Sequence, residues 1–175
     1  RSSSHALHGP AQGDAGGIFD TQGNPGSDMI RPAQESDAGA IAAILNHWIL
    51  NTAVTFNPVP KTEAEVREML ATKAAVGHGF FVACDAAGRV IGQASYGQFR
   101  GGVGYATCME HSINLVADYR GRGTGRALLQ AVEDHARQGG AHQMIAGVSS
   151  ENPDGRAFHD RMGYRVLAIV PDAGF

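Results

Sequence analysis

The sequence has little of what would mark a membrane, nucleic-acid-binding or disulfide-rich protein. Hydrophobic types make up 43% of its 175 residues, but no apolar run approaches the ~20 residues of a membrane span. The net charge is −3, whereas a nucleic-acid-binding surface shows a clustered excess of Lys and Arg. We therefore expect one soluble domain that binds neither nucleic acid nor membrane.

Cysteine is scarce as well. Cys84 and Cys108 both lie in apolar, strand-like stretches, where a reduced cysteine serves as a small hydrophobic residue. Disulfides are rare in the cytoplasm, so we expect reduced thiols and a cytoplasmic location. His5 and His8 have no further ligand types nearby, so we expect no metal site.

Residues 1–28 have a composition unlike the rest of the chain. They are rich in Gly, Ser, Gln and Pro, show no hydrophobic periodicity, and contain no apolar core of a signal peptide. We interpret 1–28 as a flexible leader or an added extension, and 29–175 as the domain.

Hydrophobic periodicity and turn residues divide the domain into helices and strands. The predicted elements are a strand at 29–31, a helix from 36 or 37 to about 49, a helix at 62–75, two strands within 79–99 that turn at 86–88, a strand within 104–116, a helix at 125–138, a strand at 142–150, a helix at 153–162 and a strand at 164–170. The order β-α-α-β-β-β-α-β-α-β predicts an α+β (α/β) fold with a mixed, mostly antiparallel sheet and helices on both faces. The chain ends soon after the last strand, which leaves open whether a strand completing the sheet is missing.

The stretch "DYRGRGTGRALLQAVEDHA" at 118–136 places glycines at alternate positions directly before an amphipathic helix. Residues without Cβ atoms let backbone N–H groups approach a ligand closely, and the positive end of the helix dipole favours an anion. No Gly-Lys-Ser/Thr follows, and the spacing differs from a dinucleotide fingerprint. The alternative is a glycine-rich connection with a solvated charge cluster.

Two segments carry a family resemblance. "RGRGTG" at 120–125 resembles the Arg/Gln-x-x-Gly-x-Gly/Ala signature of the GNAT superfamily of acyl-CoA-dependent N-acyltransferases, and "ENPDGRAFHDRMGY" at 151–164 resembles that superfamily's Asn-to-Gly-Tyr segment. The resemblance implies acetyl-CoA as co-substrate. The residues it assigns to coenzyme binding are Ile113, Asn114, Leu115, Arg120, Gly121, Arg122, Gly123, Thr124, Gly125, Arg126 and Asn152.

Three further segments narrow the resemblance. "NHWILNTAVTF" at 46–56, "ASYGQFR" at 94–100 and "MEHSINL" at 109–115 are similar to phosphinothricin and methionine sulfoximine or sulfone N-acetyltransferases. That subgroup acetylates the α-amine of small amino-acid analogues, and its members are commonly homodimers. The substrate-binding residues expected here are Phe56, Arg100, Gly101, Gly102, Tyr105, Glu110, His111 and Ser112.

The resemblance breaks down just after Arg100. Ala106 stands where the subgroup usually has a second arginine, and Gly101 and Gly102 replace bulkier residues. Arg100 is suited to pairing with a substrate carboxylate, or else it is a surface arginine. The acceptor is therefore less closely defined than the reaction.

Acetyl transfer needs a neutral amine, and Glu110 is the candidate base, directly or through a water. The alternative is a strand glutamate that points into solvent. Period-two alternation puts Glu110, Ser112 and Asn114 on one face of the strand and His111 on the other. His111 is equally a candidate base and a buried core residue.

Three other residues also have two interpretations. His159 stands where many superfamily members have a tyrosine proposed to protonate the leaving thiolate, but packing or hydrogen bonding explains it too. Asn152 is a coenzyme ligand or a helix N-cap before Pro153. Trp48 completes a stripe of core residues or helps to form the wall of the substrate pocket.

The main hypothesis is direct acetyl transfer to a small amino acid or analogue. The alternatives are an acetyltransferase for a peptide N-terminus, polyamine or aminoglycoside, and a non-catalytic coenzyme A-binding regulatory module.

Overall fold

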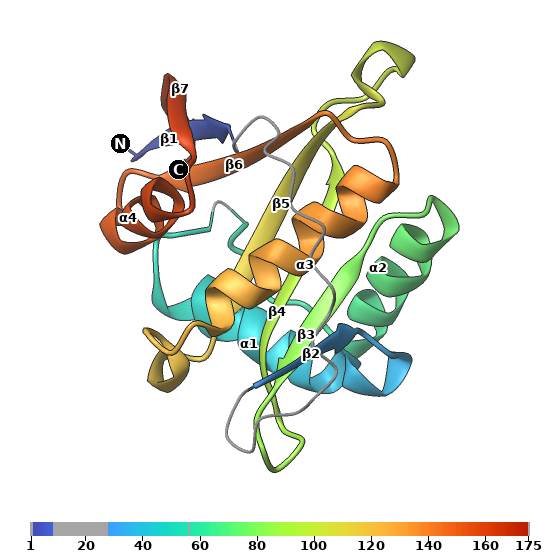
Figure 1. Ribbon diagram of the computed structural model, residues 1–175. Helices are drawn as coiled ribbons and strands as arrows, with labels where there is room; N and C mark the ends of the chain where they lie inside the picture. The colour runs from blue at the N-terminus through green and yellow to red at the C-terminus, as the bar shows by residue number, and fades with distance from the viewer. Residues whose placement is uncertain (1, 9–27, 56, 175) are drawn as a thin grey trace.

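The computed structural model describes residues 2–8, 28–55 and 57–174, which form a mixed sheet with helices on both faces (Figure 1). The strands are β1 (Ser2–His8), β2 (Met29–Pro32), β3 (Phe80–Cys84), β4 (Val90–Gln98), β5 (Cys108–Leu115), β6 (Gln143–Ser149) and β7 (Arg165–Gly174). The helices are α1 (Ala38–Asn51), α2 (Glu63–Ala75), α3 (Thr124–Gln138) and α4 (Pro153–Arg161). From β2 onward, the predicted order of elements is confirmed.

The strands are arranged β2-β3-β4-β5-β6-β1-β7 in the described sheet. Neighbouring strands are antiparallel except β5 and β6, which are parallel. The predicted mostly antiparallel sheet is therefore confirmed. The parallel pair is connected through α3, as a crossover between parallel strands requires.

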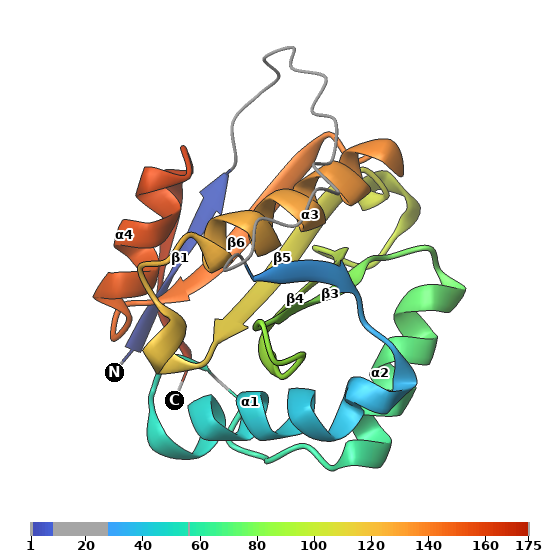
Figure 2. The same cartoon turned by 60° about the horizontal axis from the view of Figure 1, so that its bottom comes forward.

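Helices cover the sheet from two sides: α3 packs on one face and α1 with α2 on the other (Figure 2). The α3 side buries Leu128, Leu129 and Val132 against β4, β5 and β6. The opposite side buries Ile41 and Val66 against β3. No helix in the described parts of the chain has the length and apolar character needed to span a membrane.

Strand β1 was not predicted. Ser2–His8 pairs with both β6 and β7, so these residues differ from the flexible leader expected over 1–28. Backbone hydrogen bonds place this strand, and its sequence has no period-two pattern that could have indicated it. Residues 9–27 lie outside the described residues, and a leader there stays a prediction. At the other end, β7 continues to Gly174, beyond the predicted end at residue 170.

A capping box begins α2, at the Thr-x-x-Glu spacing of Thr62 and Glu65. The Thr62 hydroxyl accepts from the backbone N–H of Glu65 at 3.2 Å, and the Glu65 carboxylate accepts from the backbone N–H of Thr62 at 2.7 Å. Two N–H groups that a helix start leaves without partners are thereby bonded. Lys61, just before this cap, bonds through its backbone to the Asn46 side chain of α1.

We expect Thr62→Ala to lower the free energy of unfolding by about 1 kcal/mol, because the substitution removes the N-cap acceptor. Urea denaturation of both proteins measures the difference. Thr72→Ala is the control, since Thr72 is exposed in the interior of the same helix and alanine is the better helix former there. Equal losses in the two variants would contradict a capping role.

Candidate active site

The strands β5 and β6 separate halfway along their length. Their parallel pairing covers only Cys108–His111 against Gln143–Ala146. Beyond that point, Ile113–Leu115 pair with β4 alone and Gly147–Ser149 pair with β1 (Figure 1). On one side, therefore, the last residues of β5 have no neighbouring strand among the described parts of the chain. Backbone groups that are buried without a partner are costly, so a ligand that bonds them there is favoured.

A cavity of about 500 Å³ occupies the space where the two strands have separated. Four segments form its walls: the end of β5, the glycine-arginine loop with the start of α3, α4 with its N-cap, and the end of α1 with the segment that follows it. The lining residues are Trp48, Val54, Ile113, Asn114, Leu115, Arg120, Gly121, Gly123, Gly125, Arg126, Asn152, Asp154, Gly155, Ala157, Phe158, His159, Arg161 and Met162. Ten of the residues expected from the sequence thus meet in one place.

The loop has the local geometry that the glycines suggested. Gly121 and Gly123 have positive φ angles of 76° and 92°, a conformation that favours glycine. Gly123 is the N-cap of α3 and no side chain caps the helix, so first-turn N–H groups are available to an anion. At Gly125 a Cβ would meet the Phe158 ring at 3.3 Å, so the helix packs closely against α4.

The basic residues of the loop are not equivalent. Arg120 and Arg126 line the cavity, and Arg161 faces it from α4. Arg122 does not line it, and its guanidinium lies 5.0 Å from the centre of the Tyr119 ring. Thr124 is buried, and its hydroxyl donates to Asp28. Direct coenzyme contact by these last two residues stays a prediction.

Asn152 caps α4, which confirms the N-cap interpretation. Its side-chain oxygen accepts from the Gly155 N–H at 2.9 Å, and Pro153 follows at the first helical position. Asn152 also lines the cavity, so its expected contact with a coenzyme stays a prediction.

Glu110 lies where β5 and β6 begin to separate. Its Oε1 is 3.0 Å from the position that a Cβ would take at Gly147, so the carboxylate lies over the backbone of β6. The side chain is on the exposed face of β5 with Ser112, as the alternation predicted. Partial desolvation by the surrounding protein nevertheless raises the pKa of this carboxyl above its usual value.

His111 and His159 form a buried pair on the other face of β5. Their rings stack at 5.1 Å, their Nε2 atoms are 3.3 Å apart, and the Tyr164 ring packs edge-on against both. Tyr164 is held in turn by Glu133, whose carboxylate accepts its hydroxyl at 2.6 Å. His159 lines the cavity, whereas His111 does not.

The hydrogen bonds define the tautomers of the two rings. His159 Nδ1 faces the Gly155 carbonyl oxygen at 2.7 Å, so this nitrogen carries the proton and donates. The Nε2 of neutral His159 is then an acceptor, and His111 Nε2 must donate to it. His111 Nδ1 has no partner among the described residues. Desolvation lowers the pKa of His159. Desolvation, together with repulsion from the charge that a protonated His159 would carry, lowers the pKa of His111 to about 3. Both rings are therefore neutral near pH 7.

A buried neutral histidine makes stability dependent on pH. Above pH ~6.5 His111 is neutral in both the folded and the unfolded protein, and its contribution to the free energy of unfolding is fully present. As the pH falls from ~6.5 toward 3, the unfolded chain takes up a proton that the folded one does not, and stability is lost.

The substitution His111→Gln keeps a hydrogen-bond donor for His159 but cannot take up this proton. Between pH 7 and pH 5 we expect the free energy of unfolding of this variant to fall by about 2 kcal/mol less than that of the parent protein.

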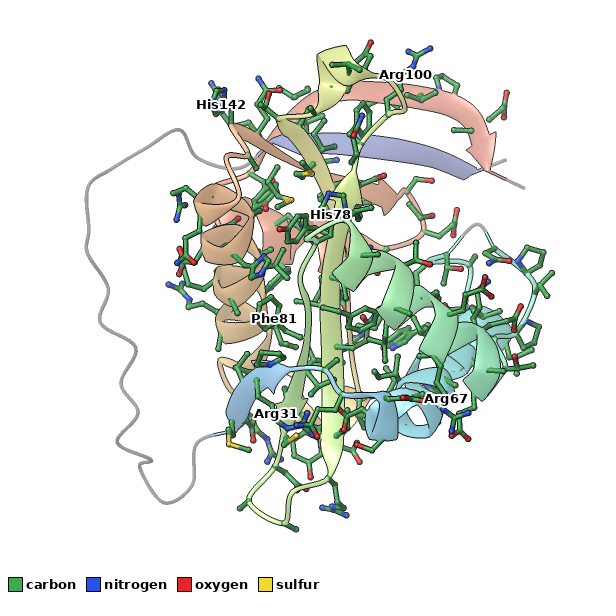
Figure 3. All side chains as sticks on the ribbon, turned by 90° about the vertical axis from the view of Figure 1, so that its right-hand side faces the viewer. Arg31, Arg67, His78, Phe81, Arg100 and His142 are labelled. Carbon is green, nitrogen blue, oxygen red and sulfur yellow. The ribbon has the colours of Figure 1, made fainter. Side chains whose placement is uncertain are left out.

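Urea denaturation at the two pH values tests this expectation. His142→Gln is the matched control, since His142 is exposed at the edge of the molecule (Figure 3). A pH dependence that is unchanged in His111→Gln would show that His111 is not held neutral.

Four of the residues expected to bind the acceptor lie at the opposite end of β5 from the loop. Arg100, Gly101, Gly102 and Tyr105 belong to the turn between β4 and β5, and none lines the cavity (Figure 3). The Arg100 guanidinium lies 5.7 Å from the Tyr105 ring centre. Glu110 pairs with Gly97 near this turn, so it lies between the turn and the cavity. Phe56 lies outside the described residues.

On the α4 side of the cavity, sequence reasoning named Asn152 and His159 but not Asp154, Arg161 and Met162, and it left the role of Trp48 open. The three unnamed residues reach the cavity through the packing of α4. Trp48 belongs to neither core cluster and lines the cavity instead. Its position at the end of the apolar stripe, just before an irregular segment, was the available signal. The described residues contain no group of three metal-ligating side chains.

Comparison with known proteins gives a consistent result. Residues 46–164 match the model of the acetyltransferase (GNAT) family. The chain is 38% identical over 148 residues to an L-methionine sulfoximine/L-methionine sulfone acetyltransferase of Pseudomonas aeruginosa, a match that covers 85% of this chain and 86% of that protein.

Solved structures agree with these matches. An acetyltransferase from Salmonella typhimurium, determined with its cofactor acetyl-CoA, superposes with a TM-score of 0.81 at 32% identity and covers 85% of this chain and 86% of its own. A phosphinothricin acetyltransferase from Sinorhizobium meliloti, in complex with acetyl-CoA, gives a TM-score of 0.80 at 32% identity and covers 85% of this chain and 80% of its own.

Proposed function

Because the chain belongs to the GNAT family of acetyltransferases, we propose that it transfers an acetyl group from acetyl-CoA to the α-amine of a small amino acid or analogue, such as phosphinothricin or methionine sulfoximine. The observation that carries this proposal is the cavity beside the end of β5, where β6 no longer pairs with it, lined by the glycine-arginine loop. Relatives of this chain act on such acceptors or bind acetyl-CoA.

The cavity residues fit the chemistry of a coenzyme A ester. The first-turn N–H groups of α3, with Arg120 and Arg126, would hold the pyrophosphate. The backbone of Ile113–Leu115, which lacks a strand neighbour on this side, would bond the amides of the pantetheine arm. When bound, acetyl-CoA would supply the acetyl group as an activated thioester.

Glu110 is the proposed base. An arm that enters at Leu115 and follows β5 would reach the point where the strands separate after about five residues, or ~16 Å, and Glu110 lies there. Its carboxylate would accept the proton that the substrate ammonium loses. Its raised pKa lies nearer to neutral pH, where a general base is most effective. The neutral amine would then attack the carbonyl carbon.

Transfer is proposed to be direct. Burial, with the nearby Glu110 charge, raises the pKa of the Cys108 thiol, so this cysteine is a poor nucleophile. His159 has no free proton donor in its neutral form, because Nδ1 donates to Gly155 and Nε2 accepts from His111. The coenzyme A thiolate is a stable leaving group, so we expect it to leave without a proton from His159.

The acceptor would bind between Glu110 and the turn that carries Arg100. Arg100 is proposed to pair with the substrate carboxylate. Ala106 and the glycines at 101 and 102 leave this side more open than in the similar subgroup, so another amine remains the second candidate.

A homodimer is also proposed by resemblance. The exposed apolar side chains of Leu167 and Ile169 on β7 support a surface that a second copy of the chain covers.

Thiol release from acetyl-CoA by the purified protein tests the function. We expect turnover with phosphinothricin, methionine sulfoximine and methionine sulfone that exceeds turnover with polyamines, peptides and aminoglycosides. Turnover confined to the latter amines would overturn the acceptor class. Binding of acetyl-CoA without thiol release for any amine would favour a non-catalytic coenzyme module.

Replacing the base separates chemistry from binding. We expect Glu110→Gln to lower kcat by about 10²- to 10⁴-fold, the usual contribution of general base catalysis, while the Kd for acetyl-CoA stays unchanged. Glu68→Gln, an exposed position on α2, is the control for a change of charge. Undiminished turnover in Glu110→Gln would show that another group takes the proton.

A further inference from the structure

Trp48 and Arg120 meet at the cavity from segments far apart in the sequence. Trp48 lies near the end of α1 and is the only tryptophan of the chain. The guanidinium carbon of Arg120 lies 4.8 Å from the centre of the Trp48 ring. This distance is within the range of a cation–π interaction, for which tryptophan is the best partner. Both side chains line the cavity.

Arg120 has a second partner in Asp154, at the start of α4. Its Nη1 lies 3.5 Å from the Asp154 Oδ2, and both side chains are substantially exposed. An exposed ion pair with this separation contributes little. The aromatic ring is therefore the contact that holds the guanidinium, and the carboxylate is a counterion that a stronger anion can replace.

The face of the Trp48 ring, not its N–H group, makes this contact. Trp48 Nε1 has no hydrogen-bond partner among the described residues. The backbone oxygen of Trp48 accepts from the Thr52 hydroxyl at 2.6 Å, and this hydroxyl accepts from the Val54 N–H at 3.4 Å, so the end of α1 is bonded to the segment that follows it. Val54 also lines the cavity. A phenylalanine at position 48 would keep an aromatic face and lose no hydrogen bond.

We propose that Trp48 is a positioning residue for Arg120: it holds the guanidinium at the mouth of the cavity, ready for a phosphate group of the coenzyme, which takes the place of Asp154. The proposal rests on the proposed function of this cavity as the coenzyme site. It adds a residue on α1, outside the glycine-arginine loop, to the residues that decide coenzyme affinity.

Calorimetric titration with coenzyme A is the first test. We expect Trp48→Leu to raise Kd about two- to fivefold, the loss of one partly exposed cation–π contact, and Trp48→Phe to raise it less. Asp154→Asn should lower Kd, since it removes a competing carboxylate. In kinetics, Trp48→Leu should raise the KM for acetyl-CoA and leave kcat unchanged, because Arg120 does not touch the reacting atoms.

A double-mutant cycle distinguishes positioning from a packing defect. If Trp48 acts through Arg120, Trp48→Leu should have no further effect on Kd in an Arg120→Ala protein. Additive losses would show that Trp48 acts independently and would overturn the proposal. Thermal melting of each variant checks that it is folded.

The single tryptophan supplies a second readout. We expect coenzyme A to change the fluorescence of Trp48, because a phosphate group replaces Asp154 beside the guanidinium that stays over the ring. Inorganic pyrophosphate should cause part of this change, and Arg120→Ala should reduce it. A parent protein that binds no coenzyme A would overturn the proposed function and this proposal together. Normal affinity in Trp48→Leu would overturn this proposal alone.

Discussion

The separation of β5 from β6 is the constraint on which the rest of the site depends. Four residue pairs hold the two strands parallel. Beyond them, among the described strands, β5 pairs with β4 alone and β6 with β1 alone. On the side away from β4, the backbone N–H and C=O groups at the end of β5 have no partner strand among the described residues. The loop that follows β5 leads directly into α3. The loss of one neighbouring strand along β5 therefore leaves a side of the strand open for the extended arm of the proposed coenzyme, with the start of α3 as the proposed anion site at its end.

The two faces of β5 have opposite proton chemistry. Glu110 lies on the accessible face, where desolvation raises its pKa and favours proton uptake. One residue later, His111 lies on the buried face and is kept neutral with His159. Alternation along a single strand thus places a carboxyl group with a raised pKa beside a histidine pair whose pKa values are lowered. The contact between His159 and His111 fixes the side of α4 that faces the cavity, and in the proposed mechanism the carboxylate takes the proton.

The sequence predicted those parts of the fold and site that local patterns determine. The glycines before α3, the alternation of Glu110 and His111, and the helix that begins at Thr62 all depend on neighbouring residues, and the structure has them as expected. Asp154 and Arg161 reach the cavity only through the packing of α4, which no local pattern specifies. Strand β1 was not predicted for the same reason, because it forms through backbone pairing with β6 and β7, which lie far away in the sequence.

The position of β1 between β6 and β7 has a consequence for how the sheet assembles. Among the described strands, β7 is hydrogen-bonded to β1 alone, so contacts between nearly opposite ends of the sequence attach it to the sheet (Figure 1). Closing so long a loop costs conformational entropy before any bond forms. The edge formed by β1 and β7 would therefore fold late, after β2, β3, β4, β5 and β6 have paired. The backbone amide hydrogens of this edge would exchange with solvent faster than those of the earlier-formed strands.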